Sequence, residues 1–232
     1  MTEYSIPDTD TYNEGRFSLH IAKPESYEWS GRSYPILYLL DGYWDFPLVR
    51  AIHGNLVYDR MSPEFIIVGI DYLGKPKHQQ LRLLRDHDLS HEHCDEFIDD
   101  LENVIIPSVE KEYRVQPLRI LGGASKGGVV ALKVMLSRPG LFYGFVCPSP
   151  AVNIEDSWIF NERALNAEVK PRLYMSRAEN DTPILWNGIQ DFASGMTMYS
   201  EVLLDDILGE GHASTKAASY TRGLRFVFLG HE

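Results

Sequence analysis

Short runs of consecutive apolar residues, many of them β-branched or aromatic, recur along the chain with helical patterns between them. Residues 36–40 have the sequence Ile-Leu-Tyr-Leu-Leu, which places no charged or amide side chain on either face of a strand. Such a strand must be covered on both faces, as in a parallel sheet between two layers of helices. The runs cover residues 17–21, 36–40, 65–70, 118–121, 142–147, 172–175 and 198–204.

Helical patterns separate these runs. Residues 95–113 carry apolar side chains at spacings of three and four, and Pro107 predicts a kink in that helix. Residues 129–136 and 213–229 predict two more helices. Strands and helices that alternate at these lengths indicate an α/β fold with a mostly parallel sheet flanked by helices.

The segment between residues 147 and 172 bears on access to any site at the sheet edge. It contains about two dozen residues, enough for one short helix around residues 157–165 and its loops. We therefore expect no large lid and an open, shallow site.

Length and charge exclude several classes of protein. The 232 residues suffice for one domain and divide poorly into two, so a single domain over residues 1–232 is expected. The net charge of −11 argues against binding of nucleic acid, because such binding requires a basic surface. The sequence shows no signal peptide at its start and no apolar run near the roughly 20 residues that span a bilayer. We expect a cytoplasmic protein with neither nucleic-acid nor membrane partners; the oligomeric state is left open.

Cysteine and histidine side chains give no metal signature. Cys94 and Cys147 are too few for a disulfide framework and are expected to be buried and inert. His87, His91 and His93 crowd beside Cys94, but their spacing matches no common metal site, and a solvated loop explains them. No metal and no cofactor are expected.

The sharpest local motif lies where an apolar run ends and a helical pattern begins. Residues 123–127 have the sequence Gly-Ala-Ser-Lys-Gly, which matches G-x-S-x-G with the serine at Ser125. A serine placed between a strand and a helix is typical of a nucleophile elbow, where strained backbone is accommodated by flanking glycines. The motif predicts Ser125 as a nucleophile; the alternative is a glycine-rich turn with an idle serine.

A serine hydroxyl needs a base within hydrogen-bonding distance. With a nucleophile elbow the histidine follows the serine along the chain, and only His212 and His231 follow Ser125. His231 is the penultimate residue, where the chain is poorly tethered. His212 lies in a polar, glycine-flanked loop before the last helical pattern and is the predicted base, although it could also be an idle histidine at a helix start.

The third member of a triad is less sharply defined. An acid is expected in the loop that follows residues 172–175, where Asp181 and Glu179 both qualify. Asp181 is favoured because it lies further into the loop and next to the turn-forming Thr182-Pro183 pair. Glu179 remains the alternative acid, and a Ser–His dyad without an acid is the third possibility.

Two backbone amides are expected to stabilise an oxyanion beside Ser125. The Lys126 amide opens the helix that follows the serine. The second donor should come from the loop after residues 36–40, where Gly42 permits a close turn and the Tyr43 amide is the predicted donor. The alternative for this loop is an ordinary Asp-Gly turn.

Together these segments resemble the putative esterase family of α/β-hydrolases, which includes esterase D, feruloyl esterases, enterochelin-type siderophore esterases and the mycobacterial mycolyltransferases. The resemblance extends from about Phe17 to Leu229. It rests on residues 34–42, 106–115, 122–132, 148–150 and 209–214.

The resemblance implies the α/β-hydrolase fold and a complete set of site residues. The serine of the family falls on Ser125 and its histidine on His212, and its oxyanion donors fall on the amides of Tyr43 and Lys126. Its acid falls within residues 179–181, where members of the family differ. One departure stands out, since many relatives carry Arg-x-Arg-Asp-Leu where residues 85–89 of this chain are Arg-Asp-His-Asp-Leu. The stretch from there to the long helix is also unusually short.

The expected activity is hydrolysis of a small-molecule carboxylic ester or thioester through an acyl-enzyme intermediate. Two alternatives stay open: an acyltransferase that uses the same triad, and a non-catalytic binding module on the same fold. The sequence does not identify the natural substrate, because one fold and one catalytic set can serve unrelated substrates.

Overall fold

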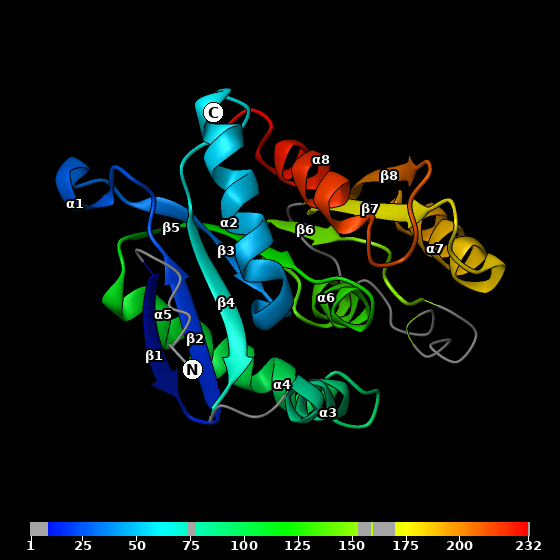
Figure 1. Ribbon diagram of the computed structural model, residues 1–232, viewed down its shortest axis with the longest axis horizontal. Coiled ribbons are helices and arrows are strands. Elements are labelled where there is room, and N and C mark those ends of the chain that lie inside the picture. Colours follow the sequence, from blue (N-terminus) through cyan, green and yellow to red (C-terminus); the bar gives the residue numbers. More distant parts are fainter. Residues whose placement is uncertain (1–8, 74–77, 153–158, 160–169, 232) are drawn as a thin grey trace.

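The computed structural model describes residues 9–73, 78–152, 159 and 170–231 (Figure 1). Its strands are β1 (Thr9–Glu14), β2 (Phe17–Ala22), β3 (Tyr34–Leu39), β4 (Ile66–Tyr72), β5 (Val115–Gly122), β6 (Gly144–Cys147), β7 (Arg172–Ala178) and β8 (Glu201–Ile207). Its helices are α1 (Tyr27–Ser30), α2 (Gly42–Tyr58), α3 (His78–Asp88), α4 (Cys94–Asp100), the π-helical turn η1 (Leu101–Ile105), α5 (Ile106–Glu112), α6 (Lys126–Ser137), α7 (Pro183–Met196) and α8 (Lys216–Phe228).

The strands form one eight-stranded sheet with the order β1-β2-β4-β3-β5-β6-β7-β8. From β4 to β8 each strand is parallel to its neighbour, whereas β1 and β2 add an antiparallel hairpin at the β4 edge. The predicted α/β class with a mostly parallel sheet flanked by helices is confirmed.

Both faces of the central strands are buried. Along β3 and the residue after it, Ile36, Tyr38 and Leu40 pack into one core cluster, and Leu37 and Leu39 pack into the other. Helices α2 and α8 lie side by side over the second face (Figure 1), and α4, α5, α6 and α7 contribute to the first. This two-sided burial is the physical reason why residues 36–40 are continuously apolar.

The predicted long helix over residues 95–113 is divided into three parts. Helix α4 is followed by the π turn η1, in which the Ile106 amide donates to the Leu101 carbonyl, and then by α5. Pro107 lies in the first turn of α5. A proline inside a continuous α-helix clashes with the carbonyl four residues before it, so the chain changes helix type just ahead of Pro107.

Other features differ from the sequence-based expectation or lie beyond it. Helices α1, α2, α3 and α7 were not predicted. Strand β1 was not predicted, because this polar edge strand has little of its surface buried and carries no apolar run. The short helix expected over residues 157–165 falls almost entirely outside the described residues. Among the described residues, no helix has the combination of length and apolar character that crossing a membrane requires.

Helix α2 begins directly after β3 and lies very close to β4. A Cβ atom on Gly42 would stand 2.7 Å from both the Gly69 carbonyl carbon and the Ile70 carbonyl oxygen. Gly69 itself is covered by Phe46, whose ring would be 2.9 Å from a Cβ placed there. The missing side chain at Gly42 therefore sets how closely the start of α2 approaches the sheet edge.

The substitution Gly42→Ala is expected to destabilise the fold by about 1–3 kcal/mol, because the added methyl group meets backbone atoms that cannot rotate away. Urea unfolding followed by circular dichroism measures this change. Gly54→Ala is the matched control in the same helix, because a Cβ at Gly54 has nothing within 4 Å. It should stabilise the protein by roughly 0.5–1 kcal/mol through helix propensity. Equal effects of the two substitutions would contradict the packing argument.

Candidate active site

Ser125 lies at a sharp turn between β5 and α6. Its backbone has φ of 56° and ψ of −121°, a conformation that L-residues rarely adopt and that costs on the order of 1–3 kcal/mol. The loop after β6 holds the turn from both sides: the Ser125 amide donates to the Pro148 carbonyl at 3.2 Å, and the Ala151 amide donates to the Ser125 carbonyl at 3.0 Å. The motif thus forms the strand–turn–helix geometry of a nucleophile elbow.

The glycines on either side of the serine are required by close contacts. A Cβ on Gly123 would lie 2.6 Å from the Gly127 carbonyl oxygen, and a Cβ on Gly127 would lie 2.7 Å from the Asp41 Oδ2 atom. The two glycines of the motif therefore pack against each other across the turn. The second of them also makes room for a buried carboxylate, a partner that the motif itself does not reveal.

Three side chains from separate loops meet at this turn. His212 Nε2 lies 2.9 Å from Ser125 Oγ, and His212 Nδ1 lies 2.8 Å from Asp181 Oδ2. Asp181 follows β7 and His212 lies between β8 and α8, so all three residues lie beyond the carboxyl ends of parallel strands. The Asp181 side chain is 4% exposed and the His212 side chain 38%, so the acid is sheltered while the imidazole faces solvent.

Glu179, the alternative acid, has a different partner. Its Oε2 atom accepts a hydrogen bond from the Gly209 amide at 2.7 Å. The Glu179 amide also donates to the Ile207 carbonyl at 3.0 Å, and the Asn180 amide donates to the Glu210 carbonyl at 2.9 Å. Glu179 therefore ties the loop after β7 to the loop that carries His212, while Asp181 is the carboxylate that contacts the imidazole.

The two amides predicted as oxyanion donors lie in the first turns of two helices. Tyr43 lies in the first turn of α2, which follows β3, and Lys126 is the first residue of α6, which follows β5. Strands β3 and β5 are parallel neighbours. The helix dipole adds positive potential at the first turn of each helix. This arrangement suits the binding of a developing negative charge.

The clustered histidines contact one another and a neighbouring carboxylate. The His87 and His93 rings stack with centroids 3.9 Å apart, and His87 Nδ1 lies 3.1 Å from Asp88 Oδ1. Across the ranges that the structure describes, no group of three or more His, Cys, Asp or Glu side chains is arranged to hold a metal ion. Cys94 and Cys147 are both buried, and burial raises the pKa of each thiol, which keeps it protonated.

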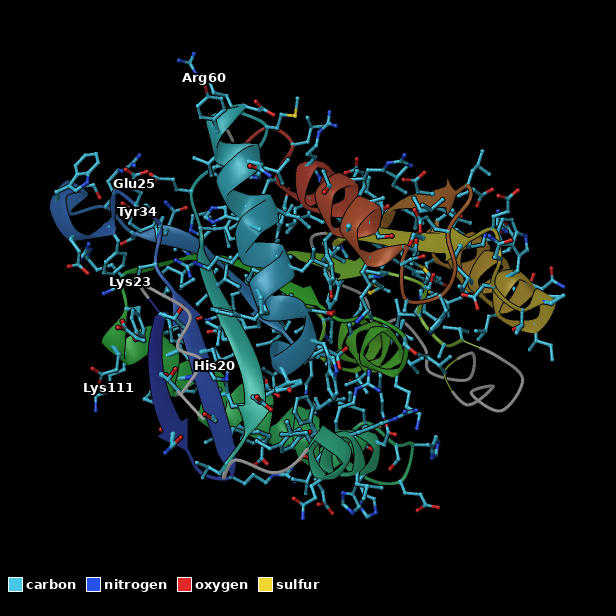
Figure 2. The ribbon with its side chains drawn as sticks, in the orientation of Figure 1. His20, Lys23, Glu25, Tyr34, Arg60 and Lys111 are labelled. Carbon is cyan, nitrogen blue, oxygen red and sulfur yellow. The ribbon has the colours of Figure 1, made fainter. Side chains whose placement is uncertain are left out.

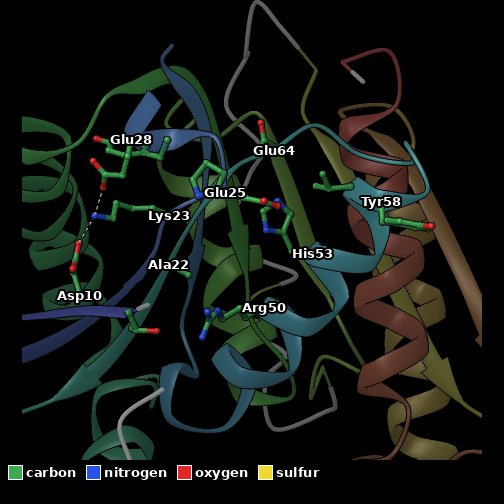
Figure 3. Close-up of a pocket in the computed structure, with 14 residues that line it drawn as sticks. Asp10, Ala22, Lys23, Glu25, Glu28, Arg50, His53, Tyr58 and Glu64 are labelled. Atoms are coloured by element: carbon green, nitrogen blue, oxygen red, sulfur yellow. Dashed lines mark hydrogen bonds and ion pairs between the residues drawn. The ribbon is translucent and has the colours of Figure 1, made fainter. Parts of the chain in front are cut away.

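A cavity of about 810 Å³ lies away from these side chains, between the end of β2 and the second half of α2 (Figure 3). Because β2 is antiparallel to β4, its last residues lie where the parallel strands begin, at the edge opposite Ser125. Lys23 and Glu25, both labelled in Figure 2, lie on its rim. Lys23 already binds Asp10 at 3.3 Å and Glu28 at 2.6 Å. Neither Ser125 nor its partners line this cavity.

A mostly parallel sheet with helices on both faces and a serine on a strained turn after a central strand defines the α/β-hydrolase fold. The sequence matches the model of the family described as "Putative esterase" over residues 12–199, and the chain belongs to this family. The family resemblance stated from the sequence is confirmed, and with it the assignment of the chain as a carboxylic ester hydrolase.

Known proteins similar to this chain come from bacteria and fungi. The ferri-bacillibactin esterase BesA of Bacillus subtilis (strain 168) is 23% identical over 262 residues, covering 96% of this chain and 90% of the relative. The crystal structure of the BES protein from Bacillus cereus has a TM-score of 0.82 at 19% identity. The match covers 98% of this chain and 97% of the Bacillus cereus chain. Siderophore hydrolase EstA from Aspergillus nidulans has a TM-score of 0.80 at 16% identity, with coverage of 97% and 98%.

His53, which lines the cavity opposite the site, is held as a neutral ring. Its Nε2 atom accepts the Phe65 amide at 3.2 Å, and its ring lies 3.9 Å from the Phe65 ring between centroids. Burial lowers the pKa of His53 to about 4, and the charge of Glu64 opposes this shift only in part.

The stability of the protein should therefore fall as the pH decreases from the unfolded pKa of 6.5 towards 4. In this interval the unfolded chain binds a proton that the folded chain does not, so acid favours unfolding, by about 3 kcal/mol when the interval has been crossed. Urea unfolding between pH 4 and pH 8 measures the slope. His53→Gln should flatten this slope relative to the wild-type protein. If His53→Gln has the same pH dependence of unfolding free energy as the wild-type protein, burial of a neutral His53 is not its cause.

Proposed function

We propose that the chain hydrolyses a carboxylic ester through a Ser125–His212–Asp181 triad and an acyl-enzyme intermediate. The observation that carries this proposal is the unbroken chain of contacts from Ser125 Oγ to His212 Nε2, at 2.9 Å, and from His212 Nδ1 to Asp181, at 2.8 Å. A base within reach of a serine, itself oriented by a third group, is the arrangement that activates a hydroxyl.

In the first half of the reaction, Ser125 Oγ attacks the ester carbonyl carbon while His212 Nε2 takes the hydroxyl proton. The carbonyl oxygen becomes an oxyanion, to which the amides of Tyr43 and Lys126 donate hydrogen bonds, each contributing about 3 kcal/mol. Asp181 stabilises the imidazolium that forms. The carbon–oxygen bond to the alcohol then breaks, and His212 returns the proton to the leaving alcohol.

In the second half, water replaces the alcohol. His212 takes a proton from the water as its oxygen attacks the acyl carbon, and the same two amides hold the second oxyanion. The bond to Ser125 Oγ then breaks, the proton returns to the serine, and the carboxylic acid leaves. No cofactor is consumed in either half.

The substrate class that we propose to test first is a siderophore ester. The support lies in the names of two similar proteins, a ferri-bacillibactin esterase and a siderophore hydrolase. A panel of aryl, feruloyl, thioester and siderophore-type esters ranks the classes by kcat/KM, with the Ser125→Ala protein as the blank. Added alcohol acceptors distinguish hydrolysis from acyl transfer, because a transferase makes new ester in their presence.

Ser125→Ala is expected to leave folding intact and to reduce hydrolysis of a p-nitrophenyl ester by at least about 1,000-fold, because no other group supplies the nucleophile. The wild-type protein should react with a fluorophosphonate probe and Ser125→Ala should not. Ser137→Ala, at the far end of α6, is the control, since its hydroxyl binds only the Lys133 carbonyl. Retained activity in Ser125→Ala, or an unlabelled wild-type protein, would sink the proposal.

Asp181→Asn is expected to lower kcat by about 10³- to 10⁴-fold, because an amide cannot stabilise the imidazolium as a carboxylate does. Glu179→Gln keeps an acceptor for the Gly209 amide and should change kcat by less than about 10-fold. Steady-state kinetics on one ester compares them. The reverse order would make Glu179 the acid, and two small effects would indicate a Ser–His dyad.

A further inference from the structure

We propose that Arg85 is a positioning residue for this reaction: through Asp41 and the Ala124 carbonyl it fixes the two segments that carry the oxyanion amides at their working separation. The inference rests on the proposed function, because it concerns the same serine and the same pair of amides. Arg85 itself contacts no reacting atom in this account.

The guanidinium of Arg85 reaches both segments at once. Its Nε donates to Asp41 Oδ1 at 2.7 Å and its Nη2 to Asp41 Oδ2 at 3.2 Å. The same Nη2 donates to the carbonyl oxygen of Ala124, the residue before the nucleophile, at 3.3 Å. One planar group on α3 therefore joins the residue that starts α2 to the residue that precedes Ser125.

Asp41 is committed to this contact in place of a more usual one. It is the N-cap residue of α2, a position where an aspartate side chain ordinarily accepts a first-turn amide of the helix. Here the carboxylate makes no such bond and points to Arg85, while the Asp41 backbone carbonyl accepts the amides of Trp44 at 3.1 Å and Asp45 at 2.8 Å. The Asp41 side chain can therefore link the start of α2 to Arg85 on α3.

The same carboxylate packs against the elbow. Its Oδ2 atom lies 2.7 Å from the position that a Cβ on Gly127 would take, which is too close for a side chain there. The Asp41 side chain is 2% exposed and that of Arg85 is 14% exposed. Burial alone would lower the pKa of the Arg85 guanidinium, but the charges and hydrogen bonds of Asp41 and, to a smaller extent, Asp86 raise it above its ordinary value. The Arg85 guanidinium therefore stays charged between the two helix starts.

A second buried carboxylate attaches the first turn of α2 to α8. Asp45 accepts hydrogen bonds from Lys216 Nζ at 2.7 Å and Tyr220 Oη at 2.6 Å, both on α8. Loss of Arg85 therefore leaves one of two attachments in place. The turn should stay folded but lose its alignment with Ser125, which separates an effect on catalysis from an effect on folding.

The test compares Arg85→Met with the wild-type protein on a neutral p-nitrophenyl ester. We expect kcat to fall by about 10- to 100-fold with KM within about threefold. Misaligned amides would bind the oxyanion of the transition state less tightly, whereas binding of the ester itself would not change. Inhibition by a boronic acid, whose tetrahedral adduct on the serine carries the negative charge, should weaken by a similar factor. Loss of packing elsewhere would not change that affinity.

Two further variants keep the test decisive if Arg85→Met folds poorly. Arg85→Lys retains the charge and the fold, but an ammonium cannot contact both segments in the same geometry, so kcat should fall by about 10-fold. The double variant Asp41→Asn/Arg85→Met should lower kcat by no more than the larger of the two single substitutions, because both remove the same contact between Arg85 and Asp41.

Arg119→Met is the matched control. Arg119, in the middle of β5, also makes a two-bond pair with one carboxylate, that of Glu110, at 2.5 and 2.7 Å, and this pair does not involve the elbow. It should lower the midpoint of thermal unfolding while leaving kcat and the boronate affinity within about twofold.

The proposal for Arg85 is overturned if Arg85→Met and Arg85→Lys keep wild-type kcat and boronate affinity, if Arg119→Met matches their losses, or if KM rises while kcat holds. Ser125→Ala, assayed in parallel, separates this failure from failure of the proposed function. An inactive Ser125→Ala beside a fully active Arg85→Met removes only the positioning role, whereas an active Ser125→Ala removes the function and this inference together.

Discussion

The central strands β3, β4 and β5 are covered by helices on both faces, and this burial fixes where the chain can place polar side chains. Only the ends of such strands reach solvent, and parallel strands bring their carboxyl ends to one edge. Ser125, Asp181 and His212 all lie in loops that leave this edge, and α2 also begins there. The meeting of these three side chains at one edge is therefore a consequence of the two-sided core.

Most of the fold and the core of the site could be predicted from the sequence because their signals are local. Continuous apolar runs mark buried strands, and a glycine-flanked serine between a strand and a helix marks the elbow. Chain order left His212 and His231 as candidate bases, and the position of His231 at the chain end favoured His212. Strand β1 and the π turn before Pro107 were beyond reach, because a polar edge strand carries no apolar run and a local change of helix type leaves the apolar spacing almost intact.

Features that depend on contacts between distant segments could not be predicted. Asp181 and Glu179 lie two residues apart in one loop, and only their partners, His212 for one and the Gly209 amide for the other, tell them apart. Arg85 and Asp41 are separated by 44 positions, and neither belongs to a motif that specifies the other. Spacing along a chain says little about which buried charges will meet.

The hydrogen bonds between the loop after β7 and the loop after β8 have a consequence for motion. The Glu179 side chain accepts a hydrogen bond from the Gly209 amide, and the Asn180 amide donates to the Glu210 carbonyl. These bonds connect the segment that bears Asp181 to the segment that bears His212. A fluctuation that draws this assembly away from Ser125 would carry carboxylate and ring along as one body. A proton on Nδ1 would keep its hydrogen bond to Asp181 throughout, so the imidazole would return to Ser125 in the same tautomer.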